Sequence, residues 1–329
     1  MVPDTTGRAV ELRDTSTATA QDKGPYVRMT GTIHPRRRAR RRGWSDRIAP
    51  YAFIAPFLLS FVLFFLGPSI FSVVLSFARY NGYTAIQWIG LQNYRSLIED
   101  PYFRQAIVNT LFYWLVPLIP LLGGGLGLAL LVRSKMARWP GFYKPLIFVP
   151  QVMAPVAAAL VWRVMLSNNG IVNSLTGFNT NWLADPGAQK WGVVLLLVWR
   201  GIGWYFVVFL AGLSSIPDEL LEAASVDGVG SFQRFRYVIL PLLRPTIVFA
   251  VVIDTIISLQ LFTEPNLLVG AGGGTIAGAP PSAAPVMNQV ITNLTGGAYG
   301  LSAAVGWLLF IVIGVFSLVQ FRLFREARA

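Results

Sequence analysis

The sequence has 329 residues, of which 54% are hydrophobic and only 13% are charged, and its net charge is +12. Because about a quarter of the residues are charged in a typical soluble domain, this composition argues against a soluble protein and indicates a membrane-embedded one. There is no Cys and the only His is His34, which excludes disulfides, thiolate chemistry, Ser-His-Asp catalysis and His-ligated metals. The Gly-rich run at 270–274 lacks the Lys of a phosphate-binding loop, so we expect no catalytic site, cofactor or metal on this chain.

The N-terminal region is polar and strongly basic. Residues 1–47 lack apolar periodicity and are predicted to form a disordered cytoplasmic tail. The run from Arg36 to Arg42 precedes the first apolar segment, as the basic region of a signal peptide does. Because five more apolar segments follow, we interpret the first one as a retained signal-anchor. We attribute the positive charge to the cytoplasmic ends of a membrane protein rather than to nucleic-acid binding.

Residues 48–329 are predicted to form an all-α transmembrane domain, because six segments contain the roughly 20 mostly apolar residues that a span needs. These segments lie at about 50–78, 106–132, 144–166, 191–213, 244–264 and 301–321. Lys and Arg, which favour the cytoplasm, gather in the tail, in the second and fourth connections and at the C-terminus. The sequence therefore predicts six membrane spans with both termini cytoplasmic; the bacterial inner membrane follows from the family resemblance described below. The uncharged, Gly- and Pro-rich region 265–300 is expected to be an outer loop with a short helix near 285–294.

The cytoplasmic connection at 214–243 has the signals of two short helices. Pro217 and the acidic residues that follow it predict a helix start, and Gly228 predicts the end of that helix. Ser231 is predicted to be the N-cap of a second helix, and Leu240-Pro241 is expected to precede the next span. The alternative is an ordinary structured loop.

This connection resembles the signature loop of ABC-importer permeases. The matching residues are Glu222, Ala223, Ala224, Asp227, Gly228, Leu240 and Pro241, at the spacing of that motif and with Val238 in the place of its Ile. Val229-Gly230 departs from the more usual Ala followed by Ser or Asn. Weaker matches, such as Gly90–Tyr94 and Asp100–Phe103, resemble the carbohydrate-type branch, and the resemblance covers about 50–325.

The resemblance implies a type I importer permease fold and several partners. These are a second, different permease subunit, two cytoplasmic ATPase subunits that bind ATP and Mg²⁺, an extracytoplasmic solute-binding protein, and the lipid around the spans. In that family a short helix of the signature loop sits in a groove of the ATPase subunit and transmits its closure to the spans. The 222–241 segment is therefore expected to couple ATP binding to alternating access of a cavity lined by the third to sixth spans.

Ionisable residues at bilayer depth usually face protein or water because burying a charge in lipid is costly. Arg163 is interpreted either as extending from the third span to the outer interface or as facing protein or water. Arg200 and Asp254 are predicted either to pair with each other or to have separate roles. The predicted substrate path consists of Arg200, Gln260, Glu264 and Asn266. The last three could donate or accept hydrogen bonds with a hydroxylated solute, or could instead satisfy a helix end.

Two structural features of the spans complete these expectations. Glycines at 123–125 predict a close approach between helices. Trp and Tyr near span ends are interpreted as interfacial anchors, with Trp199 and Trp204 as weaker candidates for stacking on a sugar ring.

Three functions were weighed for such a chain. The first is a transmembrane subunit of an ATP-driven, binding-protein-dependent importer, for a sugar or a related polyol or glycerophosphate. The second is an ion-coupled secondary transporter, but the sequence shows no convincing internal repeat and no His in a span. The third is a membrane-embedded enzyme, which the absence of a convergent set of catalytic residues disfavours.

Overall fold

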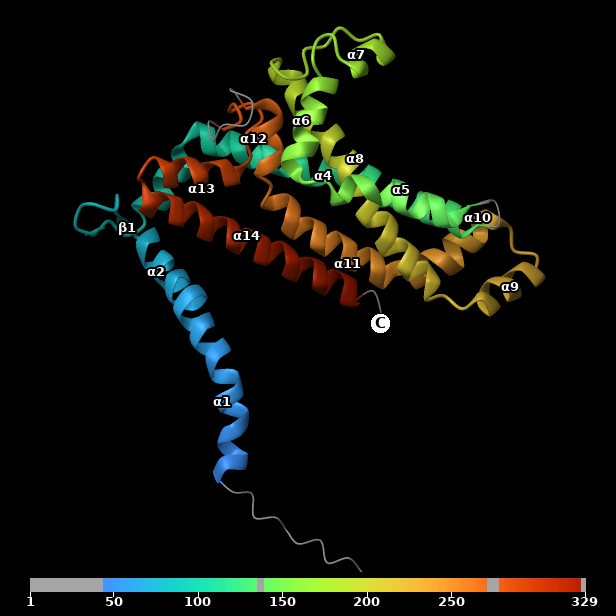
Figure 1. Cartoon of the computed structure of the whole chain (residues 1–329), viewed down its shortest axis with the longest axis horizontal. Helices are drawn as coiled ribbons and strands as arrows, with labels where there is room; N and C mark the ends of the chain where they lie inside the picture. The colour runs from blue at the N-terminus through green and yellow to red at the C-terminus, as the bar shows by residue number, and fades with distance from the viewer. Residues whose placement is uncertain (1–43, 135–138, 271–277, 327–329) are drawn as a thin grey trace, which may run out of the picture. The chain divides into compact units, whose positions relative to one another are not determined.

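The computed structural model describes residues 44–134, 139–270 and 278–326. The chain divides into two compact units, Met1–Pro56 and Phe57–Ala329. The elements are α1 Trp44–Phe61, the π-helix η1 Val62–Leu66, α2 Gly67–Ser76, α3 Gln92–Glu99, α4 Pro101–Arg133, α5 Pro140–Val152, α6 Pro155–Met165, α7 Ile171–Thr176, α8 Pro186–Ser214, α9 Asp218–Val226, α10 Ser231–Arg234, the π-helix η2 Phe235–Ile239, α11 Leu240–Leu259, α12 Thr263–Val269, α13 Val286–Thr295 and α14 Tyr299–Glu326 (Figure 1). Two short strands, β1 Ala78–Arg79 and β2 Gln87–Trp88, pair antiparallel with Ala78 opposite Trp88.

The tail expected at 1–47 falls almost wholly outside the described residues. Its last residues, from Trp44, belong to α1 and are helical rather than disordered.

Five helical stretches in the described residues are long and apolar enough to cross a membrane, and a bent pair of helices supplies a sixth. The five are Tyr51–Ser76, Pro101–Arg133, Pro186–Ser214, Ser231–Leu259 and Tyr299–Leu323. The all-α, multi-span fold class is thereby confirmed.

The third span, predicted as one straight helix over 144–166, is instead broken. Helices α5 and α6 meet at an angle of 95° (Figure 1). Met153 and Ala154 are extended, and Pro155 occupies the first turn of α6. Because Pro has no N–H to donate and disfavours a helical residue before it, Pro155 ends one helix and starts another.

The fifth span also differs from the prediction at both ends. On the cytoplasmic-loop side, α10, η2 and α11 follow one another without a break from Ser231, so no separate short helix precedes the span. Gly230 occupies the N-cap position, and Ser231 is the first helical residue rather than the cap. At the other end α11 stops at Leu259, and Glu264 lies on the next helix, α12. The short helix expected near 285–294 is present as α13.

Among the described residues, helices α4 and α8 form the most extensive helix pair, and α11 and α14 run side by side (Figure 1). The glycines of α4 explain the closeness. A Cβ on Gly125 would meet the Cβ of Tyr205 on α8 at 2.5 Å, and one on Gly124 would meet Cδ1 of Ile202 at 2.8 Å. The small-residue packing predicted at 123–125 is confirmed at these two positions.

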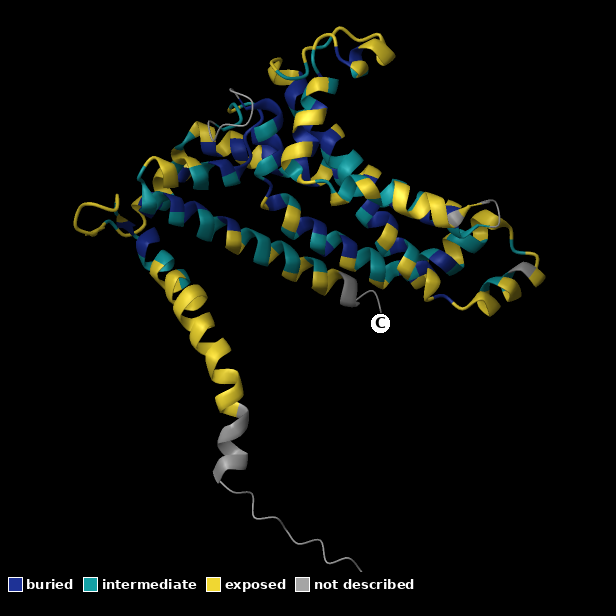
Figure 2. Ribbon diagram, viewed as in Figure 1, coloured by how far each residue is buried: buried dark blue, intermediate teal, exposed yellow. Residues whose placement is uncertain are grey.

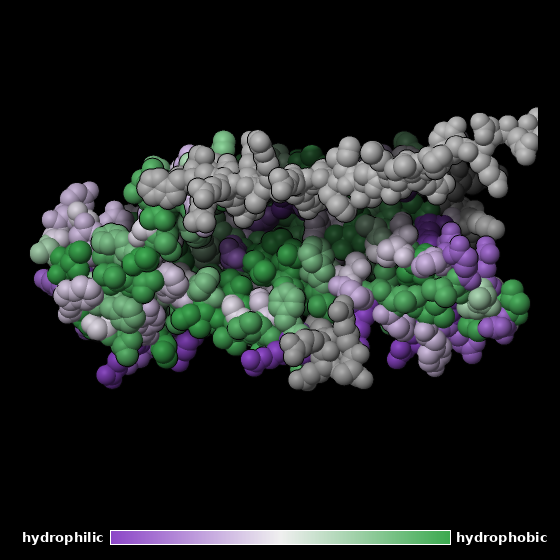
Figure 3. All heavy atoms as spheres, turned by 90° about the horizontal axis from the view of Figure 1, so that it is seen from below, coloured by the Kyte–Doolittle hydropathy of each residue, from purple (hydrophilic) through white to green (hydrophobic). Residues whose placement is uncertain are grey.

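Burial is uneven along the chain. Figure 2 shows mostly buried or half-buried residues on α8, α11 and α12, whereas Phe57, Phe64 and Phe65 on the first span are exposed. The space-filling view shows hydrophobic side chains over much of the visible described surface, with hydrophilic ones mainly along its edges (Figure 3). Such exposed apolar helix surface is expected of a protein whose surroundings are lipid or another membrane subunit.

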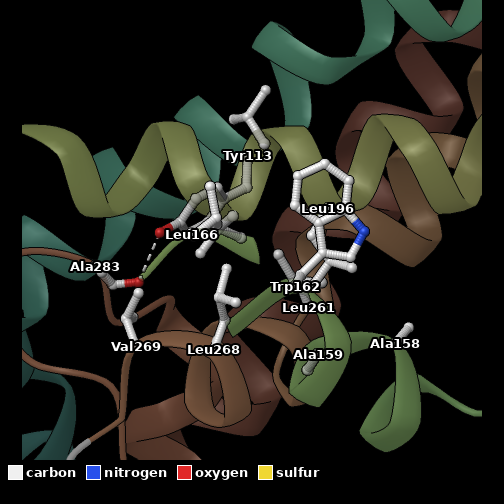
Figure 4. Close-up of a cluster of buried hydrophobic side chains, with 12 residues drawn as sticks. Tyr113, Ala158, Ala159, Trp162, Leu166, Leu196, Leu261, Leu268, Val269 and Ala283 are labelled. Atoms are coloured by element: carbon white, nitrogen blue, oxygen red, sulfur yellow. Dashed lines mark hydrogen bonds between the residues drawn. The ribbon is translucent and has the colours of Figure 1, made fainter. Parts of the chain in front are cut away.

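A buried cluster joins α4, α6, α8 and α12. Trp162, Leu166, Leu196 and Leu268 pack there, and the Tyr113 hydroxyl donates a hydrogen bond to the Ala283 carbonyl at 2.9 Å (Figure 4). This bond fastens the segment before α13 to α4, because a buried backbone carbonyl needs a donor. The cluster forms one wall of the site described next.

Candidate functional site

A cavity of about 190 Å³ lies between α4, α5, α8, α11 and the start of α12. Its walls are largely apolar, and a few polar side chains converge on it. The polar and aromatic lining residues are Tyr113, Gln151, Arg200, Trp204, Tyr205, Asp254, Ser258 and Glu264. An apolar pocket with a few convergent polar groups is the usual form of a small-molecule site.

Two polar pairs lie in this cavity, and neither is the Arg200–Asp254 pair that the sequence left open. Arg200 on α8 instead pairs with Glu264 on α12, with Nη1 and Oε1 2.8 Å apart. Asp254 on α11 accepts a hydrogen bond from the Tyr205 hydroxyl on α8. Glu264 is almost fully buried, so its charge depends on Arg200 for compensation.

Hydrogen-bonding capacity remains in the cavity after these pairs have formed. Among the described residues, Arg200 Nε and Asp254 Oδ2 are buried atoms without a partner. Gln151 and Trp204 also line the cavity, and within the described residues their side-chain polar atoms make no hydrogen bond. Buried polar groups are normally satisfied, so Arg200 Nε and Asp254 Oδ2 leave unused hydrogen-bonding capacity in this cavity.

The other two residues of the predicted substrate path do not line this cavity. Gln260 is exposed, and its Nε2 donates to the Ile256 carbonyl one turn back at 3.0 Å. Asn266 is buried and forms a reciprocal amide pair with Asn288 on α13, with both N–O distances 2.8 Å. Asn266 therefore joins α12 to the start of α13.

Arg163 is bound to the backbone of another helix. Its Nη1 donates to the carbonyls of Leu267, Leu268 and Gly270 at 3.2–3.4 Å. These carbonyls lie at the end of α12, where the last C=O groups of a helix lack intrahelical partners. Arg163 thus caps a helix that is remote in sequence, which no local pattern could have indicated.

The segment that carries the signature residues is a surface helix followed by a tight turn. Helix α9 ends at Val226, and Gly228 has φ +74°, a left-handed conformation that favours Gly. The N–H groups of Asp227 and Val229 donate to the carbonyls of Ala223 and Ala224 at 3.0 and 3.1 Å, which closes the turn. The expected helix and its end at Gly228 are both present.

One side of this segment is open. Glu222, Ala223, Asp227 and Gly228 are exposed, Ala224 is half-buried, and Leu240 and Pro241 begin α11. Large apolar side chains are exposed beside them, with Val226 87% and Phe232 77% accessible. Leu221, in contrast, packs against the core formed by Leu213, Ile216 and Ile239. One face of α9 is thus fixed to the spans, while the other presents apolar groups.

Fold and site together define a polytopic α-helical transport protein, with a polar cavity among its spans and an exposed helical segment at one end. A family model described as "binding-protein-dependent transport system inner membrane component" matches residues 120–327. The chain belongs to this family. It is a membrane-spanning component of a binding-protein-dependent transport system, which confirms the importer-permease hypothesis over the secondary-transporter alternative.

Relatives and solved structures agree with this membership. The arabinooligosaccharides permease AraP of Bacillus subtilis is 34% identical, over 89% of this chain and 96% of its own length. The lactose permease LacF of Rhizobium radiobacter is 31% identical, over 84% of this chain and 94% of its own. The sn-glycerol-3-phosphate permease UgpA of Agrobacterium fabrum is 30% identical, over 84% and 94% respectively. A chain of a bacterial ABC transporter that imports alginate shares the fold, with a TM-score of 0.72 at 23% identity over 86% of this chain and 97% of that chain.

Proposed function

We propose that this chain forms the translocation path of an ATP-driven importer of carbohydrate-class solutes. Its relatives are named for arabinooligosaccharides, lactose and sn-glycerol-3-phosphate, all of which carry several hydroxyl groups. The observation that carries the proposal is the cavity between α4, α8 and α11. There Arg200 Nε, Asp254 Oδ2, Gln151 and the ring of Trp204 offer donors, acceptors and an aromatic face.

The partners follow from the features of the chain. Two cytoplasmic ATPase subunits bind ATP with Mg²⁺ and hydrolyse the ATP, and this chain supplies no cofactor site and no catalytic site. A second, related permease subunit covers part of the exposed apolar helix surface, and a solute-binding protein delivers the ligand from outside. One structural neighbour is an alginate transporter in complex with an alginate pentasaccharide-bound periplasmic protein, which supports the last assignment.

The orientation is proposed from the distribution of charge. Lys and Arg are concentrated near the N-terminus, in the α4–α5 and α8–α11 connections and at the C-terminus. Because these residues favour the cytoplasmic side, both termini and α9 are placed in the cytoplasm. The domain boundaries follow, with a basic tail over 1–47 and a permease domain over 48–329 whose cytoplasmic coupling loop is 214–243.

Helix α9 and the Gly228 turn are proposed to dock on the ATPase. The exposed side chains of Val226 and Phe232 give this segment an apolar surface that a protein groove can cover. Closure of the ATPase subunits on ATP then moves α9 and, through the core contact of Leu221, the spans around the cavity.

Co-purification from the native membrane tests the assembly. We expect an ATPase and a second permease to accompany the wild-type chain, and the ATPase to be lost from the double variant Glu222→Ala/Gly228→Asp. The control is Gly177→Asp, because Gly177 also has a positive φ, of +71°, but lies in the turn after α7. A wild-type chain that purifies alone and transports solute without ATP would overturn the proposal.

The solute class is tested by uptake in reconstituted vesicles, with oligosaccharides, a disaccharide and a glycerophosphate compared. We expect Gln151→Leu to raise the solute concentration that gives half-maximal uptake, because its amide faces the cavity. Gln260→Leu, outside the cavity, is expected to leave it unchanged. If only Gln260→Leu raised that concentration, the solute would pass along the link between α11 and α12, where the sequence placed Gln260 in the predicted substrate path.

A further inference from the structure

We infer that Arg133 is a positioning residue that fixes the coupling helix α9 to the spans α4 and α8. The inference rests on the proposed docking of α9 on an ATPase. In the sequence, Arg133 is one of the positive charges at the second connection. Its contacts give it a more specific role.

Arg133 is the last residue of α4, and its guanidinium contacts two other elements. It donates hydrogen bonds to the carbonyls of Leu213, in the last turn of α8, and Ile216, in the link to α9, the latter at 3.3 Å. It also forms an ion pair with Asp218, the first residue of α9, with Nη2 and Oδ1 2.6 Å apart. The end of one span thus binds the end of a second span and the start of the coupling helix.

The geometry of this contact suits Arg in particular. The guanidinium presents five N–H donors in a planar fork, so it can bind two carbonyls and a carboxylate together. The Arg133 side chain is 23% exposed, whereas that of Asp218 is 79% exposed. An exposed ion pair adds little stability, so the contact matters mainly because it fixes the direction in which α9 leaves α8.

The covalent link between α8 and α9 does not fix that direction by itself. Residues 215–217 are not helical, and the buried side chain of Ile216 is the main apolar anchor within this link. Arg133 adds a second attachment, which is made to α4. Because α4 and α8 pack closely through Gly124 and Gly125, a displacement of α9 is passed to the two helices that line one side of the cavity.

The test compares transport with ATP hydrolysis in the complete importer, reconstituted with its ATPase, second permease and binding protein. For Arg133→Gln we expect the ATPase to remain bound and the number of solutes moved per ATP to fall at least about fivefold, the lower end of typical coupling between sites. Arg133→Lys keeps the charge but not the planar fork of donors. Its number of solutes moved per ATP is expected to lie between those of Arg133→Gln and wild type. Arg95→Gln is the control, because Arg95 and Glu99 form an exposed ion pair away from α9.

Asp218→Asn provides a second variant if Arg133→Gln does not fold. It removes only the exposed partner of the ion pair and is expected to lower the same ratio by a smaller factor. An unchanged ratio in both folded variants would overturn the inference, as would loss of the ATPase from Arg133→Gln, because that loss would make Arg133 a docking residue. Absence of any ATPase from the wild-type complex would instead contradict the proposed function.

Discussion

The cavity among the spans and the coupling segment around α9 are built in opposite ways. In the cavity, Arg200 finds Glu264 and Tyr205 finds Asp254 within the same chain. On α9 and α10, the apolar side chains of Val226 and Phe232 are left exposed. The cavity pairs are therefore formed within this chain, whereas the segment around α9 leaves an apolar surface that this chain does not cover.

This difference indicates where substitutions act. A buried charge or a close helix contact contributes to the stability of the permease itself, because its loss leaves an unpaired group or a clash. An exposed apolar residue contributes little to folding and becomes important when a partner binds. Two results would contradict this difference: an unchanged free energy of unfolding after substitutions in the cavity, or unfolding of the chain after substitutions in the coupling segment.

The largest effect on stability is expected at Glu264. Glu264→Gln leaves Arg200 without its counter-charge in a partly buried site, which costs about 3 kcal/mol or more of unfolding free energy. Adding Arg200→Gln should restore part of the loss, because no uncompensated charge is then buried. Thermal unfolding of the purified protein measures both changes, with Glu99→Gln in the exposed Arg95 pair as the control, expected to cost about 0.3–0.5 kcal/mol. Equal losses for Glu264→Gln and Glu99→Gln would contradict the paired cavity.

The next effect is expected at the contact between α4 and α8. Gly125→Ala places a Cβ 2.5 Å from the Cβ of Tyr205 and 3.0 Å from its carbonyl carbon, and such overpacking costs about 1–3 kcal/mol. Gly123 and Gly127 have no heavy atom within 4 Å of the corresponding position, so Gly123→Ala and Gly127→Ala are matched controls on the same helix. We expect a lower midpoint of thermal unfolding for the first variant only. A similar midpoint for all three would mean that the helices can separate without cost.

At Gly228 we expect a smaller effect on stability but a large effect on binding of the ATPase. Gly228→Ala forces a side chain into φ +74° and costs about 1–2 kcal/mol locally. Gly177→Ala, at φ +71°, carries the same cost in the turn after α7. Both variants should therefore change stability alike, but only Gly228→Ala should weaken retention of the ATPase on affinity resin. Equal retention by the two variants would remove the Gly228 turn from the docking surface.

The smallest effect on stability is expected at Phe232. Because the side chain is 77% exposed, Phe232→Ser should shift the unfolding free energy by no more than about 0.5 kcal/mol. It should nevertheless reduce ATPase binding in a titration with the purified subunits. The exposed Leu175, on α7, offers the control substitution Leu175→Ser, for which we expect no loss of ATPase binding. Strong destabilisation by Phe232→Ser would show that the residue packs within the chain.

Sequence reasoning was most successful for properties carried by a continuous stretch of residues. The apolar segments, the helix at 218–226, its end at Gly228 and the run of small residues that packs closely at Gly124 and Gly125 are all features of neighbouring residues in the chain. The signature spacing from Glu222 to Pro241 indicated the family for the same reason. The roles of these signature residues in coupling stay a proposal, since they concern another chain.

Tertiary structure decided the partners of the polar side chains. Arg200 pairs with a residue 64 positions away, Arg133 with one 85 positions away, and Arg163 caps a helix about 105 positions away. The 95° break between α5 and α6 also escaped prediction, because the segment was read by its hydropathy, which the two helices satisfy together, and Pro155 was not read as the start of a new helix. The sequence by itself determined which segments are hydrophobic enough to be removed from water, because hydrophobicity is a property of each side chain. Which polar groups then met was decided only when the helices packed, because a buried donor or charge pairs with whatever the fold brings within reach.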